Sequence, residues 1–269
     1  MDASIDRVKY DCLLFDLDDT LYPLSTGINL ACRKNIIDYM VKCLNMEEGE
    51  TPRLCLELYR EYGTTMAGLM ANGHDFDCDE FHEYVHGRLP YDRIKPDPVL
   101  RNLLLSIPQR KIVFTNSDKA HAARVLSRLG LEDCFEGVIC FETLNPSTES
   151  DRINMEEDDN TVDASKPQIL CKPSLEAIEA AIRMADINPR RTIFFDDSAR
   201  NIASAKAAGL HTVIVGSSEL VPGADHALSC IHNIKEALPE IWEGEGEGER
   251  AEQLEQVLQS PAVETIALA

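Results

Sequence analysis

Two pairs of aspartates, each at the end of a short apolar run, are the residues best suited to carry chemistry. The pairs are Asp16 with Asp18, and Asp196 with Asp197. In an extended chain, Asp16 and Asp18 project to the same side while Leu17 turns toward the core. Close carboxylates are costly to ionise together unless a cation or a shared proton accompanies them. Either pair alone would be explained by helix capping or solvation, but together they predict an oxygen-rich site suited to Mg²⁺.

A second group of polar residues is suited to binding an anion. The apolar run 111–114 ends in Thr115 and Asn116, and a helix is predicted to begin shortly afterwards. A hydroxyl beside the free N–H groups of a helix N-terminus forms a cradle for phosphate. Lys172 precedes another predicted helix and supplies a cation. Alone, Thr115 would be an ordinary helix cap and Lys172 an ordinary surface lysine; their order along the chain favours a phosphate site.

The elements that position these residues follow a strand–helix alternation. Short apolar runs predict buried strands at residues 12–18, 111–116, 137–141, 192–197 and 211–216. Helical spacing of apolar or small residues fills 122–129, 175–185 and 199–208. This pattern predicts an α/β protein with a parallel sheet covered on both faces. The polar residues then lie at the carboxyl ends of the strands, where such sheets bind ligands.

Residues 22–98 interrupt the alternation, because they contain no comparable apolar run and carry helical stripes instead. We predict a helical cap domain here, inserted into a core made of 1–21 and 99–242. Residues 142–170 are acidic, without periodicity and too long for an ordinary loop. The segment 243–269 begins with alternating Glu and Gly and is predicted to be an acidic linker and tail.

Composition narrows the classes of function. The chain has 269 residues with 47 Asp and Glu against 26 Lys and Arg, a net charge of −21. Such acidity disfavours binding of a nucleic-acid polymer. No apolar run is long enough to span a membrane, and the first residues do not resemble a secretion signal, so a cytoplasmic location is predicted. The nine cysteines include no C-x-x-C pair, which favours reduced thiols; Cys12, Cys140 and Cys171 are expected to be buried.

The order of the motifs resembles that of the haloacid dehalogenase (HAD) superfamily of phosphatases. The motifs are Asp16-x-Asp18-x-Thr20, Thr115, Lys172 before a proline, and Asp196-Asp197-x-x-x-Asn201. The resemblance covers roughly residues 10–240 and implies the HAD fold, a Rossmann-like parallel sheet core with an inserted helical cap of the C1 type. Segments 15–22, 62–69 and 86–91 resemble the plant and fungal pyrimidine 5′-nucleotidase group.

The resemblance also implies a role for each motif residue. Asp16 would be the nucleophile that forms an aspartyl-phosphate, and Asp18 would protonate the leaving oxygen and then deprotonate water. Mg²⁺ would be held by Asp16, the backbone carbonyl of Asp18 and Asp197, with Asp196 acting directly or through water. Three further residues complete the implied site: Thr115 and the Asn116 backbone would bind phosphate oxygens, Lys172 would stabilise their charge, and Asn201 would orient the metal ligands.

An acid at position 18 favours a phosphatase, because a departing alkoxide needs a proton and a departing halide does not. The expected partner is a small phosphorylated metabolite, above all a nucleoside monophosphate, bound by a monomer or homodimer. The alternatives are a phosphatase of purine nucleotides such as xanthosine monophosphate or of other small metabolites, a phosphomutase, or a non-catalytic regulatory protein. His82 and His86 could ligate a metal, but a pair on the cap surface is favoured. Candidate specificity residues are Tyr22, Tyr62, Thr64, Thr65, His86 and Arg88.

Overall fold

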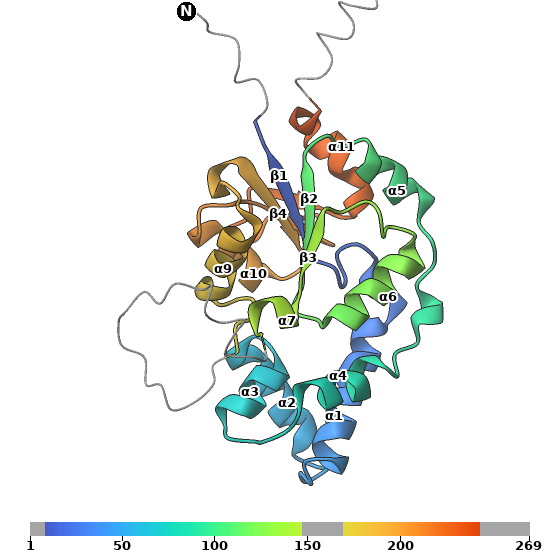
Figure 1. The fold of residues 1–269 in the computed structure, drawn as a ribbon, viewed down its shortest axis with the longest axis vertical. Coiled ribbons are helices and arrows are strands. Elements are labelled where there is room, and N and C mark those ends of the chain that lie inside the picture. Colours follow the sequence, from blue (N-terminus) through green and yellow to red (C-terminus); the bar gives the residue numbers. More distant parts are fainter. Residues whose placement is uncertain (1–8, 147–168, 243–269) are drawn as a thin grey trace, which may run out of the picture.

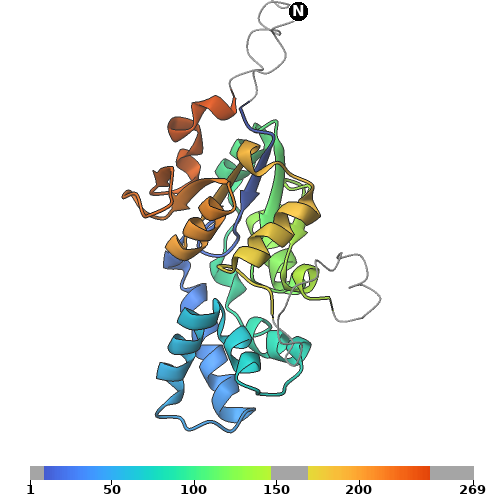
Figure 2. The ribbon, with the colours of Figure 1, turned by 90° about the vertical axis from the view of Figure 1, so that its left-hand side faces the viewer.

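The computed structural model describes residues 9–146 and 169–242. In both ribbon views, a sheet domain lies at one end and a group of helices at the other (Figures 1 and 2). The predictions for 243–269 and for 147–168 lie outside the described residues. The acidic segment does begin with structure, because a short helix, α7, covers Phe141–Leu144.

Six parallel strands form one sheet, in the order β3-β2-β1-β4-β5-β6. Their bounds are β1 Cys12–Phe15, β2 Arg110–Phe114, β3 Gly137–Ile139, β4 Thr192–Asp196, β5 His211–Val215 and β6 His226–Leu228. The predicted parallel α/β fold is confirmed, and five of the strands match apolar runs. The sixth, β6, was missed because three residues give too short a pattern. The sequence predicted that the first strand runs to Asp18. In the structure β1 ends at Phe15, and Asp18 lies in the turn that follows.

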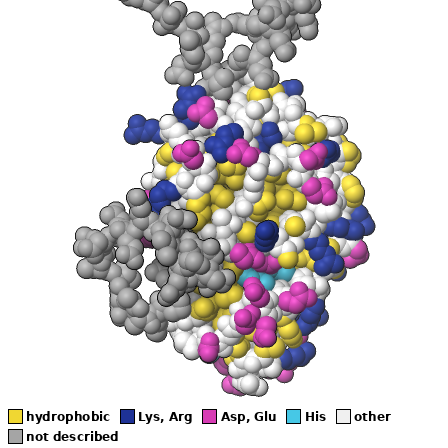
Figure 3. All heavy atoms as spheres, viewed as in Figure 1, with side chains coloured by type: hydrophobic (Ala, Val, Ile, Leu, Met, Phe, Trp, Pro, Cys, Tyr) yellow, Lys and Arg dark blue, Asp and Glu magenta, His cyan; other side chains and the backbone are white. Residues whose placement is uncertain are grey.

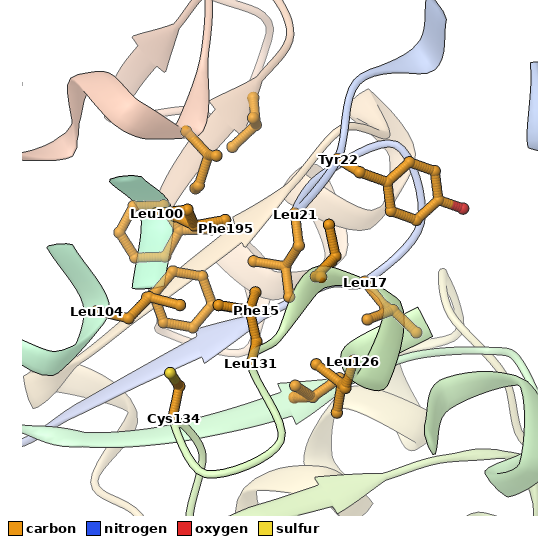
Figure 4. Packing of buried hydrophobic residues seen from close by; sticks show 14 of the residues in the cluster. Phe15, Leu17, Leu21, Tyr22, Leu100, Leu104, Leu126, Leu131, Cys134 and Phe195 are labelled. Atoms are coloured by element: carbon orange, nitrogen blue, oxygen red, sulfur yellow. The ribbon is translucent and has the colours of Figure 1, made fainter. Parts of the chain in front are cut away.

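Helices cover both faces of the sheet, as predicted. On one face Leu13 and Phe15 of β1 belong to a cluster with residues of α5 (Pro98–Leu105), α6 (Lys119–Leu129) and α11 (Ile234–Ala237). The rings of Phe15 and Phe195 stack within it with centroids 4.7 Å apart (Figure 4). On the other face Cys12 and Leu14 pack with α9 (Leu175–Ala185) and α10 (Ala199–Ala207). Alternate side chains of one strand therefore fill two cores.

Residues 22–98 hold four α-helices around a third hydrophobic cluster, to which Phe141 of α7 also contributes. The helices are α1 Ile28–Lys42, α2 Thr51–Tyr62, α3 Thr65–Ala71 and α4 Cys78–His86. Tyr39, Met40, Leu58 and Phe81 are buried in this cap cluster. Other residues of the same range belong to the cluster of the sheet domain: Tyr22, Ile28, Leu89, Tyr91 and Ile94. The exact boundaries therefore stay a prediction.

Local capping explains where the helices next to the sheet edge begin. Asp118, Ser174 and Ser198 precede α6, α9 and α10, and each side chain accepts a hydrogen bond from a backbone N–H of the first turn. Single 3₁₀ turns lie at Leu24–Thr26, Tyr91–Arg93, Pro189–Arg191, Ile231–Asn233 and Pro239–Ile241. All nine cysteines are free, and the expected burial of Cys12, Cys140 and Cys171 is confirmed. Within the described ranges, no helix has the length and apolar character that crossing a membrane requires.

Candidate active site

The polar residues singled out in the sequence meet at the carboxyl ends of β1, β2 and β4. Strand β1 lies between the other two, with Phe15 opposite both Val113 and Phe195. Asp16 extends this alignment, since its N–H donates to the Phe195 carbonyl at 2.8 Å. The parallel register therefore brings together Asp16 and Asp196, which are 180 positions apart in the chain (196 − 16).

Lys172 is the central cation of this edge. Its side chain is 1% exposed, so the surface-lysine alternative is wrong. The ammonium Nζ donates to Asp16 Oδ1 at 2.7 Å, Asp196 Oδ2 at 2.8 Å and the Phe114 carbonyl at 2.8 Å. Burial lowers the pKa of Lys172, but the charges of Asp16 and Asp196 outweigh it and raise the pKa above its ordinary value. Lys172 therefore stays charged where phosphate oxygens would need it.

Asp16, Asp196 and Asp197 form the one group suited to a metal in the described part of the chain. One carboxylate oxygen of each lies within 4.8 Å of the others. Burial raises the pKa of Asp16 to about 7; the charge of Lys172 opposes this, and the charges of Asp196 and Asp18 add to it. Asp197 is exposed, but desolvation beside this cluster, followed by the charges of Asp16 and Asp196, raises its pKa. One lysine thus leaves excess negative charge here, and an all-oxygen donor set with that charge fits a hard divalent cation.

Asp196 is the most firmly held member of this group. It is fully buried, and both of its oxygens accept from Asn201 Nδ2, at 3.0 and 3.1 Å. Ser198 N–H adds a bond to Oδ1 at 2.8 Å. With Lys172 on Oδ2, most of its acceptor sites are filled. This arrangement favours contact between Asp196 and a cation through water, and it places Asn201 one hydrogen bond away from the cluster.

The predicted phosphate residues lie directly after β2. Thr115 Oγ1 is buried, lies 2.9 Å from Ser117 Oγ and accepts from the Ser117 N–H at 3.1 Å. The Asn116 side chain does something that the sequence did not suggest. Its amide exchanges two hydrogen bonds with the backbone of Lys172, at 2.8 and 2.9 Å. Asn116 thereby fastens the Lys172 loop to the end of β2.

Asp18 is held by residues that sequence reasoning largely missed. Tyr22 Oη donates to Asp18 Oδ1 at 2.6 Å, and His121 Nε2 lies 2.7 Å from the same oxygen. Tyr91 Oη in turn lies 2.8 Å from His121 Nδ1. In Figure 4 the Tyr22 hydroxyl points away from the apolar cluster that holds its ring. We call Asp18, Tyr22, His121 and Tyr91 the Asp18 clamp.

The clamp keeps Asp18 ionised. Burial opposes ionisation, but the charge and hydrogen bond of His121 and the Tyr22 hydroxyl outweigh it and lower the pKa of Asp18 to about 2. Burial likewise opposes the charged form of His121, and Asp18 outweighs it, raising the pKa of that imidazole. One signal for His121 was present in the sequence: it falls in the first turn of a helix that starts at the sheet edge, where side chains face the site.

A pocket of about 420 Å³ opens between the sheet edge and the cap. Of the candidate specificity residues, Tyr22, Thr65 and His86 line it. Tyr62, Thr64 and Arg88 do not: the Tyr62 carbonyl accepts from Cys171, Thr64 caps α3, and Arg88 pairs with Asp38 at 3.0 Å. The wall comes instead from α1 and α2, through Asn29, Cys32, Arg33, Ile36, Cys55, Leu56 and Tyr59. Arg33 forms no ion pair or hydrogen bond with any residue that the structure describes.

A second cavity, of about 260 Å³, adjoins the first and shares His86 and His121 with it. Figure 3 shows histidine side chains flanked by acidic ones where the cap meets the sheet domain. His82 is buried at 7% exposure, so the expected surface histidine pair is wrong for this residue. His86 Nδ1 pairs with Asp118 and so links α4 of the cap to the N-cap of α6. These histidines join cap to core and form no metal group with described residues.

Comparison with known proteins places this arrangement in a family. A family model for haloacid dehalogenase-like hydrolases matches residues 10–209. The chain belongs to the haloacid dehalogenase-like hydrolases, in agreement with the order of its motifs.

The individual proteins that the chain resembles share less than a third of its residues. The chain is 29% identical over 209 residues to Phosphate metabolism protein 8 of Saccharomyces cerevisiae. The matched region covers 74% of this chain and 60% of the length of the yeast protein. The fold is similar to CbbY from Rhodobacter sphaeroides in complex with phosphate, with a TM-score of 0.55 and 18% identity over 86% of this chain and 99% of that one. A HAD phosphatase from Thermococcus onnurineus gives a TM-score of 0.51 and 18% identity, covering 84% and 96%.

Proposed function

We propose that this hydrolase is a magnesium-dependent phosphomonoesterase that forms an aspartyl-phosphate on Asp16. One observation carries the proposal: Asp16 is fixed between the Lys172 ammonium and the Thr20 hydroxyl, at 2.7 and 2.9 Å, beside the oxygens of Asp196 and Asp197. A carboxylate held in this way is oriented for in-line attack on phosphorus. Mg²⁺, when bound, supplies positive charge that offsets both the carboxylates and the phosphate oxygens.

The remaining steps fall to residues around Asp16. Thr115 and Lys172 bind the phosphate oxygens, and Lys172 stabilises the charge that the transition state spreads over them. Asp18 gives a proton to the leaving oxygen and later takes one from the water that hydrolyses the aspartyl-phosphate. The clamp leaves Asp18 ionised at neutral pH, so this proton must reach it before the bond breaks. With Nε2 protonated, His121 carries a proton 2.7 Å from Asp18 Oδ1.

The shape and charge of the pocket support a nucleoside 5′-monophosphate as the substrate. The acidic end, at Asp18, Asp19 and Asp197, requires a metal to accept a phosphate, and the other walls are mostly apolar. Arg33 is the one Lys or Arg among the residues that line it. Because a guanidinium only donates hydrogen bonds, it favours a base that presents carbonyl acceptors. Uracil presents such acceptors, and so does xanthine, which keeps xanthosine monophosphate as the second candidate.

The test is phosphate release measured with Mg²⁺ over nucleoside monophosphates, sugar phosphates and sugar bisphosphates. We expect at least a tenfold preference in kcat/KM for uridine or xanthosine monophosphate over adenosine monophosphate. A flat profile would contradict a nucleotide-selective pocket, and a preference for bisphosphates would assign Arg33 to a second phosphate instead.

Two arginines of the cap give a matched pair of variants for this test. Arg33→Ala is expected to raise KM for the preferred nucleotide about tenfold with little change in kcat, the effect of losing one binding contact. Arg88→Ala, which removes an arginine paired outside the pocket, should leave both constants unchanged. Equal effects of the two substitutions would show that Arg33 does not contact substrate.

A further inference from the structure

A thiol, an imidazole and a carboxylate are aligned outside the pocket, in residues that the proposed hydrolase reaction does not use. Cys230 Sγ lies 2.9 Å from His232 Nδ1, and His232 Nε2 lies 2.8 Å from Asp97 Oδ2. None of the three lines the 420 Å³ pocket. We call this group the Cys230 triad.

The fold fixes all three members. Cys230 and His232 flank the start of the 3₁₀ turn after β6, which the Asn233 N–H closes by donating to the Cys230 carbonyl at 3.0 Å. Asp97 is the N-cap of α5: its Oδ1 accepts from the Leu100 N–H at 2.8 Å, and Oδ2 is left to His232. The backbone N–H of Asp97 donates to the Leu129 carbonyl at 3.0 Å. The base is therefore oriented by a carboxylate that is itself held at two points.

The order of the groups suits activation of a thiol. When His232 Nε2–H donates to Asp97, Nδ1 is the basic nitrogen and faces the Cys230 thiol. The sulfur is also accessible, because Cys230 is exposed. Accessible thiols beside an oriented imidazole are the ones that exchange with disulfides and react with electrophiles.

The other cysteines lack this combination. Seven are buried or half-buried, and burial raises the pKa of Cys12, Cys32 and Cys171 among them. Cys43 is the remaining exposed cysteine, and it follows the last residue of α1. No histidine is paired with Cys43 among the contacts of the described residues. Cys43 is therefore an internal control: it is exposed, as Cys230 is, but no base lies beside its thiol.

We propose that Cys230 is a modification site that exchanges with low-molecular-weight disulfides such as oxidised glutathione. His232 Nδ1 takes the thiol proton, and Cys230 Sγ attacks one sulfur of the disulfide. The disulfide bond of the reagent breaks as the mixed disulfide with Cys230 forms. The other half leaves as a thiolate, which takes the proton from His232. Cys230 is oxidised and one half of the reagent is reduced to a thiol.

The first test compares two cysteines in one molecule. The full chain is treated with oxidised glutathione or, separately, with iodoacetamide, and peptide mass spectrometry follows Cys230 and Cys43 over time. Activation by a general base predicts that Cys230 reacts at least ~10-fold faster than Cys43 with both reagents. Equal rates, or faster reaction of Cys43, would overturn the proposal without any substitution.

The second test removes the base. His232→Gln is expected to bring the Cys230 rate down to that of Cys43 while Cys43 itself is unaffected, which also reports an intact fold. Asp97→Asn keeps a side chain able to cap α5 and should give a smaller loss. His211→Gln, a histidine with no cysteine partner among the described contacts, is the control. An unchanged Cys230 rate in His232→Gln would exclude the triad.

Discussion

The sheet edge, which lies behind the acidic end of the pocket, and the cap wall, which lines the opposite side, are built differently. At the sheet edge, Asp16, Asp196 and Lys172 are buried, and each makes two or more hydrogen bonds to side chains or backbone. On the cap wall, Tyr59 is 44% exposed, and Arg33 is exposed with no ion pair to the residues that the structure describes. The sheet edge is thus held by buried polar contacts, whereas the cap wall presents exposed side chains, of which Tyr59 lies under the Arg200 guanidinium at 4.7 Å.

This difference separates catalysis from selection. Attack on phosphorus requires groups placed to within fractions of an ångström, which buried and mutually bonded side chains provide. Recognition of the rest of a substrate requires only that unpaired donors and apolar surface be available. Substitutions at the sheet edge should therefore lower kcat, and substitutions on the cap wall should raise KM.

The largest effect is expected at the nucleophile. Asp16→Asn should lower phosphate release by at least ~10⁴-fold, because the amide cannot attack phosphorus. The substitution also removes one negative charge from a crowded buried cluster, so the melting temperature of the metal-free protein should not fall. Turnover above background in a folded Asp16→Asn protein would contradict the assignment.

Asp18→Asn should have a smaller effect that depends on the substrate. Loss of general acid and base catalysis predicts a decrease of ~10²–10⁴-fold in kcat for an alkyl phosphate such as a nucleotide. The decrease should be smaller with p-nitrophenyl phosphate, whose leaving group needs little protonation. Equal losses on both substrates would show that Asp18 positions other groups and does not transfer the proton.

The Asp18 clamp lies between the two regions and should show intermediate behaviour. His121→Leu removes a donor to Asp18 without touching the cation cluster, and we expect a decrease of roughly 10–10²-fold in kcat with KM nearly unchanged. His121→Gln, which can still donate a hydrogen bond, should recover part of the loss. Because His121 is buried, Tyr22→Phe serves as a second variant that removes the other donor. A change confined to KM would place the clamp with the cap wall.

Sequence periodicity predicted the sheet edge well, for a physical reason. Asp16 and Thr115 follow buried strands and Asp196 ends one, and the parallel register leaves little freedom in where strand ends meet. Lys172 was predicted to belong to the site because it precedes a predicted helix. The finer arrangement was not predicted: β1 stops at Phe15, so Asp18 turns toward His121 instead of standing beside Asp16 as in a strand.

The cap wall was predicted poorly, because helix periodicity identifies a buried stripe but not what an exposed face meets. Arg33 lies on α1, where the sequence shows only one of two adjacent basic residues, Arg33 and Lys34. Arg88 looked equally suitable until the structure paired it with Asp38 and with the Tyr84 ring, at 4.2 Å. The pairing of Arg88 with Asp38 joins residues 50 positions apart in the chain, and such a contact leaves no mark in local spacing.

The smallest expected effect is on the stability of the folded protein, which should vary with pH and with bound metal because of the carboxylates at the sheet edge. In the metal-free protein the pKa of Asp16 is about 7, raised by burial from 3.8, so the folded state binds a proton more tightly than the unfolded state. Its contribution is fully present below 3.8 and is lost as pH rises through about 7. Asp18, whose pKa is lowered to about 2, acts in the opposite direction but only in more acidic solution.

Thermal unfolding with EDTA or with saturating Mg²⁺ measures this dependence. The melting temperature with EDTA should fall between about pH 5 and pH 8, and Mg²⁺ should restore it most at the upper end, by a shift on the order of 3 °C. In Asp16→Asn the fall should be smaller, because the titrating group is gone, and the shift caused by Mg²⁺ should shrink with it. Arg33→Ala should retain the full wild-type response. A Mg²⁺ shift that is independent of pH, or equally small in both variants, would mean that the carboxylate cluster is not where the cation binds.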